Sequence, residues 1–164
     1  MCSSDLQARP WVVLGLGGSH PLKEWPAETW AEFVGGLRKQ FAGTVFLIGG
    51  AAQTPNAAEL MTRTSGASVI DATALSLIEA AALLREADLF VGPDSGPMNL
   101  AAAVGTPAFA MFGATRVLTY SKFIHPILPD DGGGPTLHGM ARISARNVLS
   151  RIAPSLEAQG SVRA

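Results

Sequence analysis

The chain has 164 residues, which is enough for one compact domain and too few for a second full hydrophobic core. Apolar residue types make up 48% and charged types 15%, and 12 Lys and Arg against 13 Asp and Glu give a formal net charge of −1, which excludes a disordered chain and a basic nucleic-acid surface. The longest nearly uncharged stretch, 99–115, is interrupted by Gly and Pro before it reaches the roughly 20 residues of a membrane-spanning helix.

Short apolar runs alternate with helical patterns as far as residue 112. Residues 1–10 match neither period, and we expect a linker or an artificial remnant there. Strands buried on both faces are indicated by continuous apolar runs at 11–16, 44–48, 69–71, 89–91 and 108–112. Four helical patterns separate these strands: the first follows Pro26, the second covers 54–62, the third starts at a capping box at Ser76, and the fourth covers 96–103. In the third helix, Leu77 and Leu84 are expected to face inward. About five strands and four helices predict an α/β, Rossmann-like open parallel sheet with helices on both faces.

The alternation stops after Phe112. Residues 113–139 contain three prolines and an Asp-Asp-Gly-Gly-Gly run, and we expect a long irregular loop. A last helix is predicted from Ser144, with Val148 and Ile152 on one stripe, ending before Pro154. The predicted domain therefore spans 11–153, and a frayed tail is expected over 154–164.

Glycine-rich loops follow four of the predicted strands. In an open parallel sheet, ligands bind outside the carboxyl ends of the strands, where these loops meet. Glycines there let a ligand approach the backbone and leave N–H groups free for anionic oxygens. Turns between strands and helices need glycine in any case, but four such loops at one edge favour a phosphate-bearing ligand. The candidate binding residues are Gly17, Gly18, Ser19, Lys23, Gly50, Gln53, Asp94, Ser95, Gly96, Met98 and Asn99.

Two of these loops contain charged residues. Asp94 and Ser95 come directly before a helix whose N-terminus favours anions, so Ser95 and the amides of Gly96 and Met98 suit phosphate oxygens. Asp94 would repel phosphate and suits a sugar hydroxyl. The alternative is that Asp94 or Ser95 only caps the helix. Lys23 is the one cation of the first glycine loop, and it is interpreted as a diphosphate contact or, alternatively, as an ordinary surface lysine.

Several common sites are excluded by spacing. The first loop has His20 where a dinucleotide fingerprint needs its third glycine, and Lys23 lacks the following Ser or Thr of a phosphate-binding P-loop. Gly96 directly follows Ser95, which does not fit a serine hydrolase elbow. The three histidines lack spaced carboxylate or Cys partners, so neither a metal nor a cofactor is expected.

Taken together, the motifs resemble glycosyltransferase family 9, the ADP-heptose:lipopolysaccharide heptosyltransferase group, and specifically the C-terminal, nucleotide-sugar-binding half of its GT-B fold. The resemblance covers about 12–153 and rests on Lys-Glu-Trp-Pro at 23–26 and on the Asp-Ser-Gly-Pro-Met run at 94–107. It implies that Lys23 contacts phosphate, Ser95 and Gly96 the diphosphate, and Asp94 the sugar. The chain departs from the family's usual residues at Asn99, where His is common, and at Gln53, where many members carry Glu.

The resemblance implies an inverting, metal-independent transferase in which a carboxylate base activates an acceptor hydroxyl. The base and the acceptor surface belong to the N-terminal half, which we expect this chain to lack, so its catalytic residues are unknown. The implied partners are a nucleoside diphosphate sugar and, through that other half, a glycan or lipid-linked acceptor. With one cysteine, Cys2, and no leader pattern, we expect a cytoplasmic protein, peripheral at the inner membrane as an alternative for the full-length chain.

Two other functions remain open from the sequence. One is a nucleotide or nucleotide-sugar-binding module that works alone and without catalysis. The other is a relative of the UDP-N-acetylglucosamine 2-epimerases, which also use a GT-B arrangement.

Overall fold

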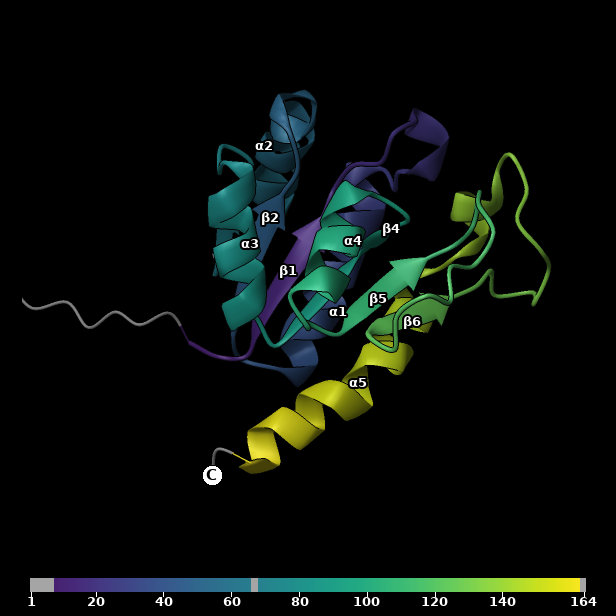
Figure 1. Cartoon of the computed structure of the whole chain (residues 1–164). Coiled ribbons are helices and arrows are strands. Elements are labelled where there is room, and N and C mark those ends of the chain that lie inside the picture. Colours follow the sequence, from purple (N-terminus) through teal and green to yellow (C-terminus); the bar gives the residue numbers. More distant parts are fainter. Residues whose placement is uncertain (1–7, 66–67, 163–164) are drawn as a thin grey trace, which may run out of the picture.

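The computed structural model describes residues 8–65 and 68–162. In that part of the chain, one parallel sheet has the order β3-β2-β1-β4-β5-β6. Its strands are β1 (Trp11–Gly15), β2 (Thr44–Ile48), β3 (Val69–Asp71), β4 (Leu89–Pro93), β5 (Ala108–Met111) and β6 (Ile124–Ile127). The helices are α1 (Ala27–Gln40), α2 (Thr54–Arg63), α3 (Leu77–Glu86), α4 (Gly96–Ala103) and α5 (Ala145–Val162) (Figure 1). The predicted Rossmann-like fold with helices on both faces is confirmed, with six strands instead of about five.

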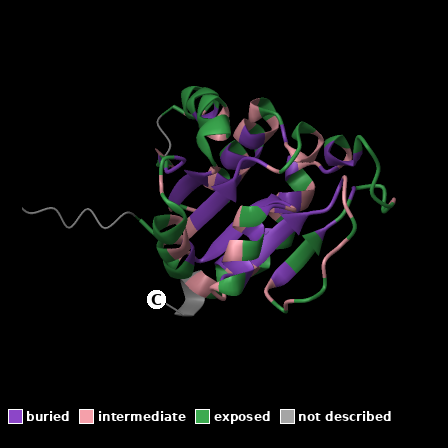
Figure 2. Ribbon diagram, turned by 45° about the horizontal axis from the view of Figure 1, so that its top comes forward, coloured by how far each residue is buried: buried purple, intermediate pink, exposed green. Residues whose placement is uncertain are grey.

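The sheet separates two hydrophobic layers. Alternate strand residues point to opposite faces, so that Leu14 and Val91 join the layer beneath α1, α2 and α5, whereas Val13 and Phe90 join the layer beneath α3 and α4. Figure 2 shows the central strands buried along their length, which explains their continuous apolar sequences.

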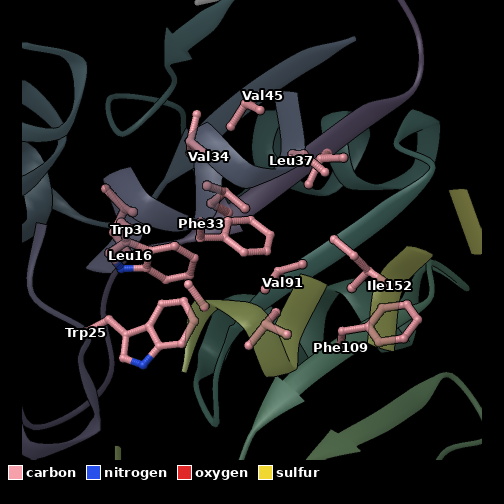
Figure 3. Close-up of a cluster of buried hydrophobic side chains, with 14 of the residues drawn as sticks. Leu16, Trp25, Trp30, Phe33, Val34, Leu37, Val45, Val91, Phe109 and Ile152 are labelled. Atoms are coloured by element: carbon pink, nitrogen blue, oxygen red, sulfur yellow. The ribbon is translucent and has the colours of Figure 1, made fainter. Parts of the chain in front are cut away.

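An aromatic cluster fixes the segment between β1 and α1. Trp25 lies edge-on to Trp30, with ring centroids 4.9 Å apart, and Phe33 packs against both rings (Figure 3). The Trp25 indole N–H donates to the carbonyl of Met140 at 3.3 Å, and Trp25 is only 3% exposed. The loop that carries Lys23 is therefore anchored at its C-terminal end.

The sixth strand lies inside the stretch that was predicted to be an irregular loop. β6 pairs with β5 alone, at the edge of the sheet, where Pro126 lies opposite Ala110. An edge position tolerates a proline because one side of the strand needs no hydrogen bonds. His125 and Pro126 are exposed while Ile124 and Ile127 are buried, so the strand has no continuous apolar run. The prediction of a wholly irregular segment was wrong for this reason.

Packed structure continues past both predicted ends of the domain, 11 and 153. Helix α5 continues through Pro154 to Val162. A proline inside a helix costs about 3 kcal/mol, but Ile152 and Leu156 are buried on either side of it, and each such burial stabilises by about 1.5–3 kcal/mol. At the other end, the Thr44 hydroxyl donates to the carbonyl of Ala8 and Arg9 pairs with Asp88 at 3.1 Å. Residues 8–10 thus contact the domain, and the rest of the expected linker, 1–7, lies outside the described residues.

Candidate functional site

A cavity of about 710 Å³ opens at the carboxyl ends of the strands. It lies where the chain leaves β1 and β4, the neighbours at which the strand order changes direction, which is the usual ligand position in such sheets. Eight of the eleven candidate residues line it: Gly17, Gly18, Ser19, Gly50, Gln53, Ser95, Gly96 and Asn99. Lys23, Asp94 and Met98 do not.

One wall of the cavity is apolar and was not predicted. It is built by Ile48 at the end of β2, by Leu75 just before α3, by Leu77 and Ala80 in the first turn of α3, and by Leu100 and Ala103 of α4. Leu77 was expected to face inward with Leu84, but it is 74% exposed, whereas Leu84 is fully buried. The helical stripe of α3 is therefore shorter than its sequence suggested, and its first turn faces the cavity.

The polar wall is the N-terminus of α4. Ser95 caps this helix, because its hydroxyl oxygen accepts the Met98 amide at 3.4 Å. Both interpretations of Ser95 are compatible, since the same hydroxyl can still donate its hydrogen to a ligand. A Cβ added to Gly96 would meet nothing within 4 Å, so this residue faces open space. The helix dipole makes this wall favourable for an anion.

Met98 was expected to offer its amide to a phosphate, but neither its amide nor its side chain faces the cavity. Its amide is bonded to Ser95, and its side chain is fully buried in the layer beneath α4. The first turn of α4 therefore has fewer available amides than the sequence suggested.

Lys23 and Asp94 meet next to Gly18 and Ser95, two residues that line the cavity. The Lys23 ammonium lies 3.4 Å from the Asp94 carboxylate, and their side chains are 21% and 17% exposed. Lys23 also packs against the first glycine loop, since a Cβ on Gly18 would lie 2.8 Å from the Cβ of Lys23. The two residues lie 71 positions apart in the sequence, and the fold brings them together beside Ser95.

The two glycine loops after β1 and β2 use part of their hydrogen-bonding capacity internally. The amide of Gly18 donates to the Glu24 carboxylate at 3.2 Å, and the amide of Gly50 donates to the side-chain oxygen of Gln53 at 2.9 Å. These two amides were expected to be free for a phosphate. Glu24 was not among the candidates, and its position between Lys23 and Trp25 is the only sequence signal that points to it.

Asn99 on α4 is linked to a loop that the sequence did not associate with the site. The hydroxyl of Tyr120, in the segment between β5 and β6, donates to the side-chain oxygen of Asn99. Tyr120 is 64% exposed and is the only tyrosine of the chain. This bond leaves the Asn99 amide nitrogen as the group that can donate to a ligand.

Among the residues that the structure describes, no three His, Cys, Asp or Glu side chains are grouped as a metal site would require. Within the same residues, no helix is long and apolar enough to cross a membrane.

Solved structures of known proteins share this fold. The structure of E. coli ADP-heptose lps heptosyltransferase II superposes with a TM-score of 0.79 over 93% of this chain and 48% of its own, at 23% identity. E. coli heptosyltransferase WaaC with ADP gives a TM-score of 0.74 over 90% of this chain and 45% of its own, also at 23% identity. At these identities the likeness shows the fold alone. The chain spans about half the length of these structures.

The amino-acid sequence gives a more specific result. Lipopolysaccharide heptosyltransferase 3 of E. coli strain K12 is 38% identical over 68 residues, which is 39% of this chain and 20% of that protein. The family model of glycosyltransferase family 9 (heptosyltransferase) matches residues 2–128, more than three quarters of the chain. The chain therefore belongs to glycosyltransferase family 9.

Proposed function

We propose that this chain forms the donor-binding side of a transferase that moves a sugar from an ADP-heptose-like nucleotide sugar to a lipopolysaccharide or other glycan acceptor. The observation that carries the proposal is the cavity of about 710 Å³ at the N-terminus of α4, with Lys23 packed against Gly18, one of its lining residues. Family membership supports a transferase, and two solved relatives are WaaC with ADP and WaaC with ADP-2-deoxy-2-fluoro heptose.

The two walls of the cavity suit the two ends of such a donor. The apolar wall of α3 and α4 side chains matches the flat face of a nucleotide base. A diphosphate fits at the start of α4, where Ser95 can donate from its hydroxyl and Gly96 faces open space. Lys23 is close enough to exchange its bond to Asp94 for one to a phosphate oxygen. Asp94, thereby released, can accept a hydroxyl of the sugar.

The chemistry that follows is a displacement at the anomeric carbon with inversion and without a metal. An acceptor oxygen forms the new bond as the bond from that carbon to the phosphate oxygen breaks, and the electron pair leaves with the nucleoside diphosphate. Lys23 and the N-terminus of α4 stabilise the charge that develops on the diphosphate. We assign the carboxylate base, which takes the proton of the acceptor, to a part of the protein beyond this chain, and the reaction to the cytoplasm.

Calorimetry of the isolated chain against ADP-, UDP- and GDP-sugars tests the proposal. We expect weak binding of a nucleotide sugar, strongest for the ADP conjugate, and no sugar transfer by this chain alone. The absence of heat with all three would refute the donor site. If the full-length protein binds the donor but never transfers the sugar to a glycan acceptor, the protein is a binding module instead.

A further inference from the structure

Glu24 and Gln53 join the two glycine loops that line the cavity. The amide of Gly50 donates to the Gln53 oxygen at 2.9 Å, and the Gln53 nitrogen donates to Glu24 Oε1 at 3.4 Å. The same Oε1 accepts the amide of Gly18 at 3.2 Å. A continuous chain of hydrogen bonds therefore runs from the turn after β2 to the loop after β1.

The Gln53 side chain also fills the space between these loops. A Cβ on Gly17 would lie 2.3 Å from the Gln53 side-chain carbonyl carbon, and a Cβ on Gly49 would lie 2.7 Å from the Cβ of Gln53. Real Cβ atoms do not approach other atoms so closely, so these positions need glycine as long as Gln53 lies between them. The Gln53 side chain therefore lies between the two loops and contacts both of them.

Glu24 is held at its own end. The next residue, Trp25, is buried and bonded to the carbonyl of Met140, which fixes the backbone from which the Glu24 side chain extends. Because Oε1 of a carboxylate can accept two donors, Glu24 can hold Gly18 and Gln53 at the same time.

We propose that Glu24 is a positioning residue for the donor: it acts through Gln53 and Gly18 to hold the cavity open at the width that a nucleotide sugar requires. This inference rests on the proposed function for its ligand. It also gives a physical reason for Gln at position 53. The group that faces Glu24 must donate a hydrogen bond, and a glutamate at position 53 would bring two carboxylates within about 3.4 Å of each other.

Four variants separate this role from a general structural one. Glu24→Ala removes both bonds, Glu24→Gln keeps an oxygen that can accept both, and Gln53→Glu opposes two carboxylates. The double variant Glu24→Gln with Gln53→Glu reverses donor and acceptor between the two positions. Glu32→Ala removes an exposed carboxylate from the middle of α1 and serves as the matched control.

Two measurements are made on each variant, after its melting temperature has shown that it is folded. Amide hydrogen exchange at Gly18 and Gly50 reports the loops without any ligand, and calorimetry with an ADP-sugar reports the donor. We expect Gly18 to exchange about tenfold faster, and the donor to bind about tenfold more weakly, in Glu24→Ala and Gln53→Glu, the equivalent of one hydrogen bond. Glu24→Gln and the control should stay within about twofold of the parent on the same scale, and the double variant should recover most of the loss in Gln53→Glu.

The outcomes distinguish this inference from the proposed function. Unchanged exchange at Gly18 in Glu24→Ala overturns the positioning role, whatever the donor does. Faster exchange with unchanged donor affinity also overturns it, because the loops would then not matter for binding. A parent chain that binds no nucleotide sugar refutes the proposed function and, with it, the role of Glu24 toward a donor.

Discussion

Replacement of Lys23 by alanine should weaken the binding of a nucleoside diphosphate and leave the fold intact. Lys23 ends a short 3-10 turn, Pro21–Lys23, between β1 and α1, and its ammonium is 3.4 Å from the Asp94 carboxylate. At that separation two unit charges interact by about 1 kcal/mol in water and about 5 kcal/mol at an effective dielectric constant of 20. With side chains 21% and 17% exposed, the pair lies between these limits. Its loss leaves Asp94 uncompensated beside the proposed diphosphate.

The expected change in affinity follows from two effects with the same sign. A charge-assisted bond to phosphate contributes about 1–3 kcal/mol, and the unpaired charge of Asp94 adds repulsion. A loss of about 1–3 kcal/mol raises the Kd for ADP by about 5-fold to 150-fold, and the added repulsion places the expected rise toward the upper end of this range. Calorimetry measures it, with Lys39→Ala at the exposed end of α1 as the control. An unchanged Kd in Lys23→Ala would mean that Lys23 is an ordinary surface lysine.

Two smaller predictions concern stability and the segment around β6. Gly139→Ala should destabilise the protein by about 1–3 kcal/mol or more, because its Cβ would overlap the carbonyl of Gly113. Gly134→Ala is the control, because Gly134 has open space around it and the substitution should not destabilise the protein. Urea unfolding compares the two variants, and equal midpoints would contradict the close approach of Gly139 to Gly113. Hydrogen bonds from Arg142 hold the pKa of Asp131 below its ordinary value, so the stability from this pair is present above about pH 4 and lost as the pH falls through the lowered pKa. Asp131→Asn should flatten that loss, and an identical acid dependence in the variant would exclude this contribution.

The position of the site could be predicted from the sequence more completely than its internal bonds. Continuous apolar runs at β1, β2, β4 and β5 indicate strands covered on both faces, and the glycines that follow them mark the carboxyl edge. Local patterns of this kind are enough to place Gly17, Gly50 and Ser95 around one cavity. β6 was not predicted, because this short edge strand with Pro126 has neither a continuous nor an alternating pattern of apolar residues.

Pairings across the fold could not be predicted in the same way. Nothing in the sequence near Lys23 indicates that its partner is Asp94, because that contact depends on the order in which β1 and β4 lie side by side. The bond of Gln53 to Glu24 likewise depends on the distance between two neighbouring loops. Helical periodicity places Leu77 on the stripe of Leu84, yet Leu77 is 74% exposed and Leu84 is buried.

Mapping of ADP binding on the isotope-labelled chain by NMR tests the donor site most directly. The largest amide shifts on titration with ADP are expected at Gly17, Gly18, Ser95 and Gly96, around the cavity at the start of α4. A second hollow of about 530 Å³, beside β6 and the start of α5, carries Arg146 and Arg151 and offers an anion an alternative. Shifts that cluster at those arginines, with the four cavity amides unchanged, would contradict a donor site at the start of α4.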